Sequence, residues 1–115
     1  MQDYRKLVVW QKAHQLTLRM YAVSERLSEP RAWPLRDQLR ASISVPSNIA
    51  ERTGRGTDRD FRRFLLITLG SLNEVEYDLL LAKDLGFIPA AEHLVLQAQV
   101  EEVRRMLSGL IASMR

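Results

Sequence analysis

Apolar residues recur at alternating steps of four and three along most of the sequence, and this spacing constrains the fold more than any other feature. The first series contains six residues: Val9, Ala13, Leu16, Met20, Val23 and Leu27. Such steps keep side chains on one side of an α-helix, so the series predicts a helix over roughly residues 7–28. Three further series follow, and each predicts another helix with one buried face.

The second series is interrupted by a proline and ends in a polar segment. It runs through Leu35, Leu39, Ser42, Pro46, Ile49 and Thr53. Pro46 lacks the N–H that would bond the carbonyl of Ser42, so a kink or break is expected inside this helix. Asn48 is expected to donate to the freed carbonyl, which gives Pro46 and Asn48 structural roles. Glu51 and Arg55 share a face, where an exposed ion pair contributes about 0.5 kcal/mol.

Two more series complete a set of four helices. The third contains Phe61, Leu65, Thr68, Leu72, Val75, Leu79 and Ala82, and the fourth contains Leu96, Val100, Val103, Leu107, Leu110 and Met114. Thr57 and Asp60 resemble a capping box, Gly86 suits a C-terminal cap, and Pro89 suits an early position of the fourth helix. Short links between four such helices predict one all-α domain over residues 1–115, an antiparallel up-down-up-down four-helix bundle.

Several apolar residues fall outside the four series and indicate a second buried surface. They are Trp10, Leu18, Ile43, Leu66, Leu80 and Val95. Large exposed apolar patches are uncommon on monomers, so we expect a homo-oligomer. Gly70, in the middle of the third helix, costs about 1 kcal/mol relative to alanine. We therefore expect a close approach between helices at Gly70, opposite the Pro46 kink.

Charge is distributed unevenly along the chain. The net charge of +3 over 115 residues divides into 13 Lys and Arg against 7 Asp and Glu in residues 1–63, and 4 against 7 in the remainder. The basic first half predicts a face for an acidic partner, of which nucleic acid is the commonest. The chain has no cysteine, no apolar run of about 18 residues and no signal-peptide pattern. We expect a soluble cytoplasmic protein with no membrane contact.

Five arginines cluster where the second helix passes into the third. They are Arg52, Arg55, Arg59, Arg62 and Arg63. Backbone N–H groups of the turn with Gly54 and Gly56 can hold a phosphate, and these arginines would surround it with positive charge. Arg36 and Arg40 on the second helix are further candidates. Few aromatic residues lie nearby, so phosphate contacts with little sequence specificity are expected. A glycine cap beside a solvated basic face explains the same residues without a ligand.

No pattern for catalysis, a metal or a cofactor stands out. A di-iron bundle requires a glutamate three residues before each histidine, and His14 and His93 lack it, so we expect both at the surface. Neither a nucleophile elbow nor a phosphate-loop lysine motif is present. Glu74 and Asp78 share a helix face and are expected on a solvated side or at an interface. We therefore expect a protein that is not an enzyme and carries no cofactor.

Several short motifs carry a family resemblance. They are Leu7-x-x-Trp10-x-x-Ala13, Gln38-Leu39-Arg40-Ala41, the segment SVPSNIAE from Ser44 to Glu51, Arg55, the segment from Phe61 to Leu65, Gly70-Ser71-Leu72 and the turn Leu85-Gly86-Phe87-Ile88. With them the chain resembles the four-helix-bundle proteins encoded in intervening sequences of bacterial 23S rRNA genes. Those proteins are in turn similar to the accessory proteins of diversity-generating retroelements. Arg52 stands where the family pattern has a glycine.

The resemblance implies a helical bundle that assembles as a homopentameric ring. For the retroelement relatives it also implies basic surfaces that bind nucleic acid and a reverse transcriptase. Two functions therefore remain open. The first is an oligomer that binds RNA or DNA through the arginines. The second is a structural or adaptor homo-oligomer that binds a protein partner, with the arginines paired to the acidic second half of neighbouring subunits.

Overall fold

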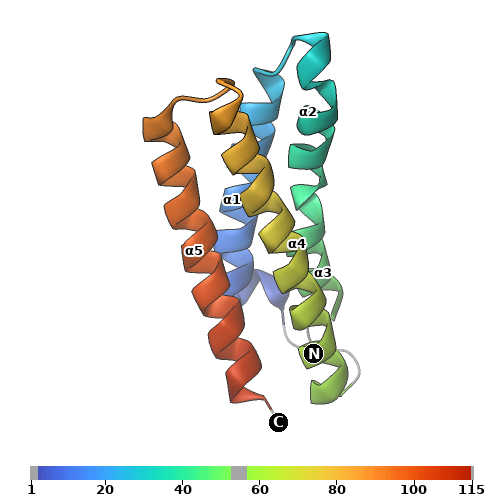
Figure 1. Cartoon of the computed structure of the whole chain (residues 1–115). Coiled ribbons are helices and arrows are strands. Elements are labelled where there is room, and N and C mark those ends of the chain that lie inside the picture. Colours follow the sequence, from blue (N-terminus) through green and yellow to red (C-terminus); the bar gives the residue numbers. More distant parts are fainter. Residues whose placement is uncertain (1–2, 53–56, 115) are drawn as a thin grey trace.

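Five α-helices and three 3-10 turns make up the described part of the chain, which covers residues 3–52 and 57–114 of a computed structural model. The helices are α1 (Val8–Glu25), α2 (Trp33–Arg40), α3 (Ser44–Arg52), α4 (Asp58–Asp84) and α5 (Ala90–Ser113), and the turns are Tyr4–Lys6, Pro30–Ala32 and Ala41–Ile43. α2 and α3 follow each other along one line, so together they form the second arm of a four-armed bundle (Figure 1). The predicted all-α four-helix bundle is confirmed.

The four arms alternate in direction and give the protein the shape of a rod of 44 × 21 × 20 Å (Figure 1). α1 packs against α5 on one side and against α2 and α3 on the other, and α4 packs against the same neighbours. α1 and α4 therefore lie diagonally across the core. Among the described helices, none is both long and apolar enough to cross a membrane.

The predicted apolar series form the core. All six residues of the first series are buried, and none exposes more than 6% of its surface. The third series is buried from Leu65 to Ala82, while Phe61 at its start is half-buried. At the end of the fourth series Leu110 and Met114 are half-buried, and Ile111 is buried instead. Each buried leucine contributes about 1.5–3 kcal/mol, so these positions hold the arms together.

The second arm breaks one turn before Pro46. The 3-10 turn Ala41–Ile43 ends α2, and α3 starts at Ser44, so the buried Pro46 lies in a first helical turn, where its missing N–H removes no helical bond. The hydroxyl of the buried Thr17 on α1 donates to the carbonyl of Ala13 at 3.1 Å and also lies 3.4 Å from the carbonyl of Ser42. That carbonyl accepts from the N–H of Ser44 as well. The break is confirmed, but the prediction that Asn48 supplies this donor is wrong. Asn48 is half-buried.

Both ends of α4 follow the sequence prediction. The Thr57 side chain accepts a hydrogen bond from the N–H of Asp60 at 3.2 Å, as an N-cap does. At the other end Gly86 has φ +82°, and the N–H of Phe87 donates to the carbonyl of Ala82 at 2.9 Å. This is a Schellman C-cap, and it turns the chain into α5. The expected glycine turn at Gly54 and Gly56 lies outside the described residues.

Gly70 and most of the apolar residues outside the core series face away from the bundle. A Cβ built on Gly70 would meet no atom within 4 Å, so the prediction of a close approach between helices is wrong within the chain. Exposed fractions are large at Leu18 (58%), Ile43 (51%), Leu66 (45%), Leu80 (40%) and Val95 (51%), whereas Trp10 is half-buried. The chain therefore presents an apolar surface that its own arms leave uncovered.

Candidate nucleic-acid interface

Three arginines gather on the first two turns of α4, and they are called the arginine surface below. Arg59, Arg62 and Arg63 are all exposed, because the buried face of α4 in this part passes through Phe61 and Leu65. They line a hollow of about 750 Å³ together with Asp60, Leu66 and Met114. Met114 follows the end of α5, so the hollow lies where the last turn of α5 approaches the start of α4.

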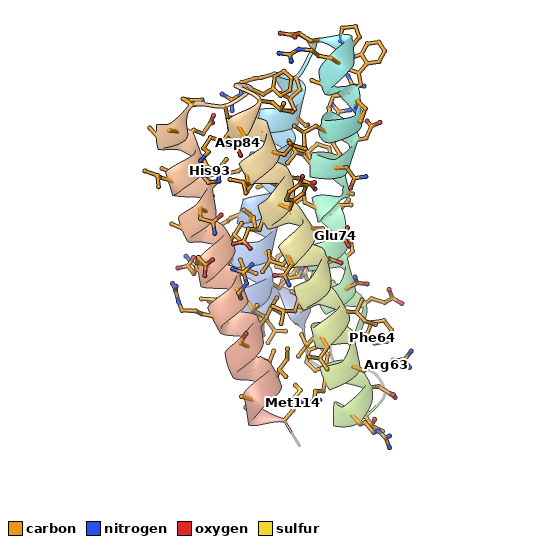
Figure 2. The ribbon with its side chains drawn as sticks, viewed as in Figure 1. Arg63, Phe64, Glu74, Asp84, His93 and Met114 are labelled. Carbon is orange, nitrogen blue, oxygen red and sulfur yellow. The ribbon has the colours of Figure 1, made fainter. Side chains whose placement is uncertain are left out.

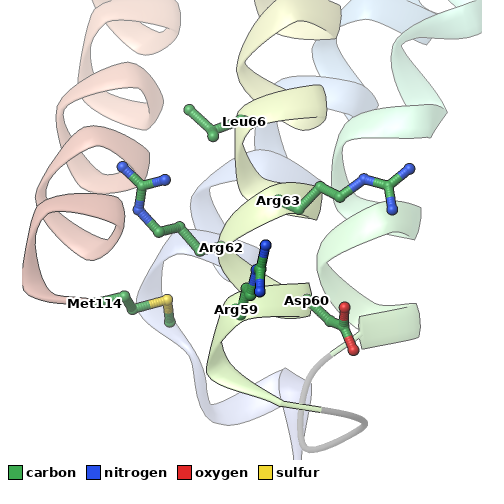
Figure 3. Close-up of a pocket in the computed structure, with 6 residues that line it drawn as sticks. All are labelled: Arg59, Asp60, Arg62, Arg63, Leu66 and Met114. Carbon is green, nitrogen blue, oxygen red and sulfur yellow. The ribbon is translucent and has the colours of Figure 1, made fainter.

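The three guanidinium groups spread over this end of the bundle instead of converging on one point. Figure 3 shows Arg62 reaching toward α5 and Arg63 pointing to the opposite side, with Arg59 between them. Within the described part of the chain none of the three forms an ion pair. Asp60 is the acidic residue that lines the hollow. Such an array suits an extended polyanion, whose phosphates are spaced along a chain, better than one small anion.

Two of the remaining arginines of the sequence prediction are described with their side chains, and the structure places both away from this surface. Arg55 lies outside the described residues, and Arg52 is described only as the last residue of α3. Arg36 and Arg40 lie on α2, toward the opposite end of the rod (Figure 1). Both are half-buried and engaged: Arg36 lies over the Trp33 ring at 5.5 Å. The Nε of Arg40 donates to Ser24 at 3.0 Å. The structure therefore does not bring these two together with the α4 arginines.

Most acidic residues of the second half are paired inside the subunit. The pairs are Arg104 with Glu76 and Glu101, Arg26 with Glu92, Lys12 with Glu102, and Lys83 with Asp84. Arg104 donates to both carboxylate oxygens of Glu76, at 2.9 and 3.2 Å, and links α5 to α4. A hydrogen bond from Gln97, with further help from Arg104, lowers the pKa of Glu76. Five of the seven carboxylates in the second half thus already have a basic neighbour within their own subunit.

Two acidic residues of α4, Glu74 and Asp78, have no such partner in the described part of the chain. The sequence predicted the exposure of Glu74 but not the burial of Asp78. Glu74 is exposed, as expected, but Asp78 is 8% exposed and lies in a small notch between α4 and the second arm. Burial, with a smaller effect of the Glu74 charge, raises the pKa of Asp78 to about 6. The sequence signal was its position three residues after Val75 and directly before Leu79, at the margin of the buried face.

Both histidines were expected at the surface, but only one of them is fully exposed. His14 is exposed and stacks on Trp10, with ring centroids 5.0 Å apart. His93 is half-buried on α5, near the end of the rod that also carries Asp84, whereas Arg63 and Met114 mark the other end (Figure 2). Across residues 3–52 and 57–114, no three His, Cys, Asp or Glu side chains come together as metal ligands commonly do.

Comparisons with known proteins agree with this architecture. The model of the family described as 23S rRNA-intervening sequence protein matches residues 5–109. No curated protein shows significant similarity to the chain. Among solved structures, the chain is similar to a protein of unknown function from the S23 ribosomal protein family of Bacteroides thetaiotaomicron. The TM-score is 0.84 and the identity is 26%, over 90% of this chain and 98% of that one.

Proposed function

The chain belongs to the family of 23S rRNA-intervening sequence proteins, and from this premise we propose that it is an oligomeric helical bundle that binds nucleic acid with little sequence specificity. The observation that carries the proposal is the arginine surface. Arg59, Arg62 and Arg63 are exposed, border one hollow, and lack carboxylate partners in the described residues. Arginines that lie on neighbouring turns of one helix and have no ion-pair partner can bind successive phosphates of one nucleic-acid strand.

The character of the hollow determines the kind of binding. Its lining holds three arginines, one aspartate and two apolar side chains, with no ring on which a base could stack. Sequence readout depends on base-edge contacts or stacking, whereas phosphate contacts fix position only. Binding through this surface should therefore have similar affinity for different sequences and should weaken steeply with salt.

Self-association is the second part of the proposal. The exposed apolar residues Leu18, Ile43, Leu66 and Leu80 lie on α1, the break of the second arm and α4, and water contact at each is unfavourable. A second copy of the chain would cover them. The family resemblance makes five subunits the expected number, and a ring would repeat the arginine surface once per subunit and raise the avidity for a long polyanion.

The adaptor function, with a protein partner and no nucleic acid, is the alternative. It predicts that the arginines pair with carboxylates of neighbouring subunits. The acidic residues of the second half are mostly paired within the subunit instead, which favours the nucleic-acid function.

Fluorescence anisotropy with a labelled mixed-sequence RNA at low salt tests the proposal. The double variant Arg59→Gln with Arg63→Gln should bind at least tenfold more weakly, while light scattering shows an unchanged oligomer. Arg105→Gln is the matched control, because Arg105 is also exposed but lies on α5. Dissociation of the oligomer by the double variant, or no RNA or DNA binding by the unmodified protein, would favour the adaptor function.

A further inference from the structure

A small polar notch lies between α4 and the break in the second arm, away from the arginine surface. Its volume is about 50 Å³, and it is lined by Gln38 and Ser44 from the second arm and by Ser71, Glu74 and Asp78 from α4. Steps of three and four place the α4 residues on one face of the helix. Figure 2 shows Glu74 where α4 faces the second arm. A ligand bound in the notch would therefore contact both α4 and the second arm.

Asp78 lines the notch and has no hydrogen-bond or ion-pair partner within the described residues. The residue exposes 8% of its surface, and no hydrogen-bond donor or cation of the described chain reaches its carboxylate. The charged group that acts on it is Glu74, which carries the same sign. A buried carboxylate without a partner is costly, and proteins usually resolve this cost with a counter-charge. A positive group bound in the notch would therefore stabilise the ionised form of Asp78.

The other lining side chains identify the kind of cation. The lining residues that carry side-chain polar groups are two carboxylates, two hydroxyls and one amide, so oxygen ligands dominate and nitrogen or sulfur ligands of the usual kind are lacking. Hard divalent cations prefer such ligands, and a space of about 50 Å³ holds an ion with a few waters. We propose that the notch is a divalent-cation site in which Asp78 and Glu74 neutralise Mg²⁺, Mn²⁺ or Ca²⁺ with the help of Ser44, Ser71 and Gln38.

The site would bridge the interruption in the second arm. The second arm is interrupted at Ala41–Ile43, between Gln38 and Ser44, and the same cation would contact α4. Only two of the ligands are charged and Glu74 is exposed, so the affinity should be low, with Kd of about 10⁻⁴ to 10⁻³ M. Ion binding would hold the two halves of the arm against α4, and this inference does not depend on nucleic-acid binding.

A Mn²⁺ titration of the full chain, followed by the electron paramagnetic resonance of the free ion, tests the site directly. The wild type should bind saturably, and Asp78→Asn should weaken binding at least tenfold. Asp84→Asn is the matched control, because it removes an exposed carboxylate from the same helix and should leave binding unchanged. If Asp78→Asn fails to fold, Ser71→Ala and Glu74→Gln replace it, and each should weaken binding at least threefold.

Thermal unfolding with Mg²⁺ or Ca²⁺, at fixed ionic strength, provides the second measurement. At an ion concentration of ten times Kd the ratio of folded to unfolded wild type should rise about tenfold, with no such rise in Asp78→Asn. Equal Mn²⁺ binding by the wild type and Asp78→Asn, or no saturable binding by the wild type, would overturn the proposal. The absence of any ion-dependent rise in the stability of the wild type would overturn it as well.

Discussion

Replacing Asp78 with asparagine should make the metal-free protein more stable at neutral pH and leave its stability unchanged in acid. Burial raises the pKa of Asp78 from 3.8 to about 6 in the folded chain. The protonated carboxyl therefore favours the folded state. This contribution is complete below about pH 4 and is lost as the pH rises through about 6, since the carboxyl must then ionise in the notch. Asparagine keeps the neutral form at every pH.

The pKa values give the size of the effect. The difference between 3.8 and about 6 corresponds to roughly 3 kcal/mol at full ionisation. The notch is open at its mouth, where solvent relieves part of this cost, so we expect a difference of about 1–3 kcal/mol between variant and wild type at pH 7.5. For a domain of this size that raises the melting temperature by about 5 °C or more.

Urea and thermal unfolding at pH values from 4 to 7.5, in chelator-treated buffer, measure this difference. The two proteins should have similar stability at pH 4, should diverge mainly between pH 4 and 6, and should differ by a constant amount above about pH 6.5. Asp84→Asn is again the control, since its exposed carboxylate should give curves parallel to the wild type. A constant difference between Asp78→Asn and wild type across the whole range would refute the reasoning, because it would show that ionisation of Asp78 has no effect on folding.

Three further substitutions test other parts of the structure. Arg104→Met removes the two hydrogen bonds to Glu76 and should lower the free energy of unfolding in urea by about 1–2 kcal/mol, since both groups are only partly buried. Thr17→Val removes the buried hydroxyl that lies between the carbonyls of Ala13 and Ser42 and should cost about 1 kcal/mol in the same assay. Gly70→Ala should stabilise the chain by about 0.5–1 kcal/mol with an unchanged mass in light scattering, whereas a loss of the oligomer would place Gly70 at a subunit contact.

The core was predictable because it depends on one quantity, the spacing of apolar residues along each helix. Leu16, Leu39, Leu72 and Leu107 stand one in each arm, and each is buried as its series predicts. The residues outside the series were predicted to lie on a second surface, and Leu18 and most of the others do lie exposed. Helix ends with local signals, such as the cap at Gly86, could also be located.

Features that depend on how two arms meet could not be predicted. The proline predicted a break, but only the packing of α1 beside the second arm shows that Thr17, twenty-five residues from Ser42, faces the freed carbonyl. Asp78 has an ordinary helical context in sequence, and its burial follows from the arm packed over it. For Gly70, a close approach between helices was predicted only because glycine destabilises the middle of a helix. The structure shows no atom within 4 Å of the place where a Cβ would lie.

The candidate site was predicted in part for a related reason. Sequence proximity alone brought Arg59, Arg62 and Arg63 together, because they lie within two turns of one helix. Arg36 and Arg40 were grouped with them on the strength of charge, but the length of the second arm separates them in space (Figure 1). The distribution of charge along a sequence indicates that a basic surface exists. Which arginines share that surface depends on how the arms are arranged in space.

The dependence of RNA affinity on salt shows whether the arginine surface binds phosphates. A plot of log affinity against log salt concentration should be linear for the wild type, and its slope should become shallower by about 1.4 units when Arg59 and Arg63 are both replaced by glutamine, since each phosphate contact to a single strand contributes about 0.7. Affinities for unrelated sequences should fall together. A slope that is the same in the double variant and the wild type would mean that the phosphate contacts lie elsewhere.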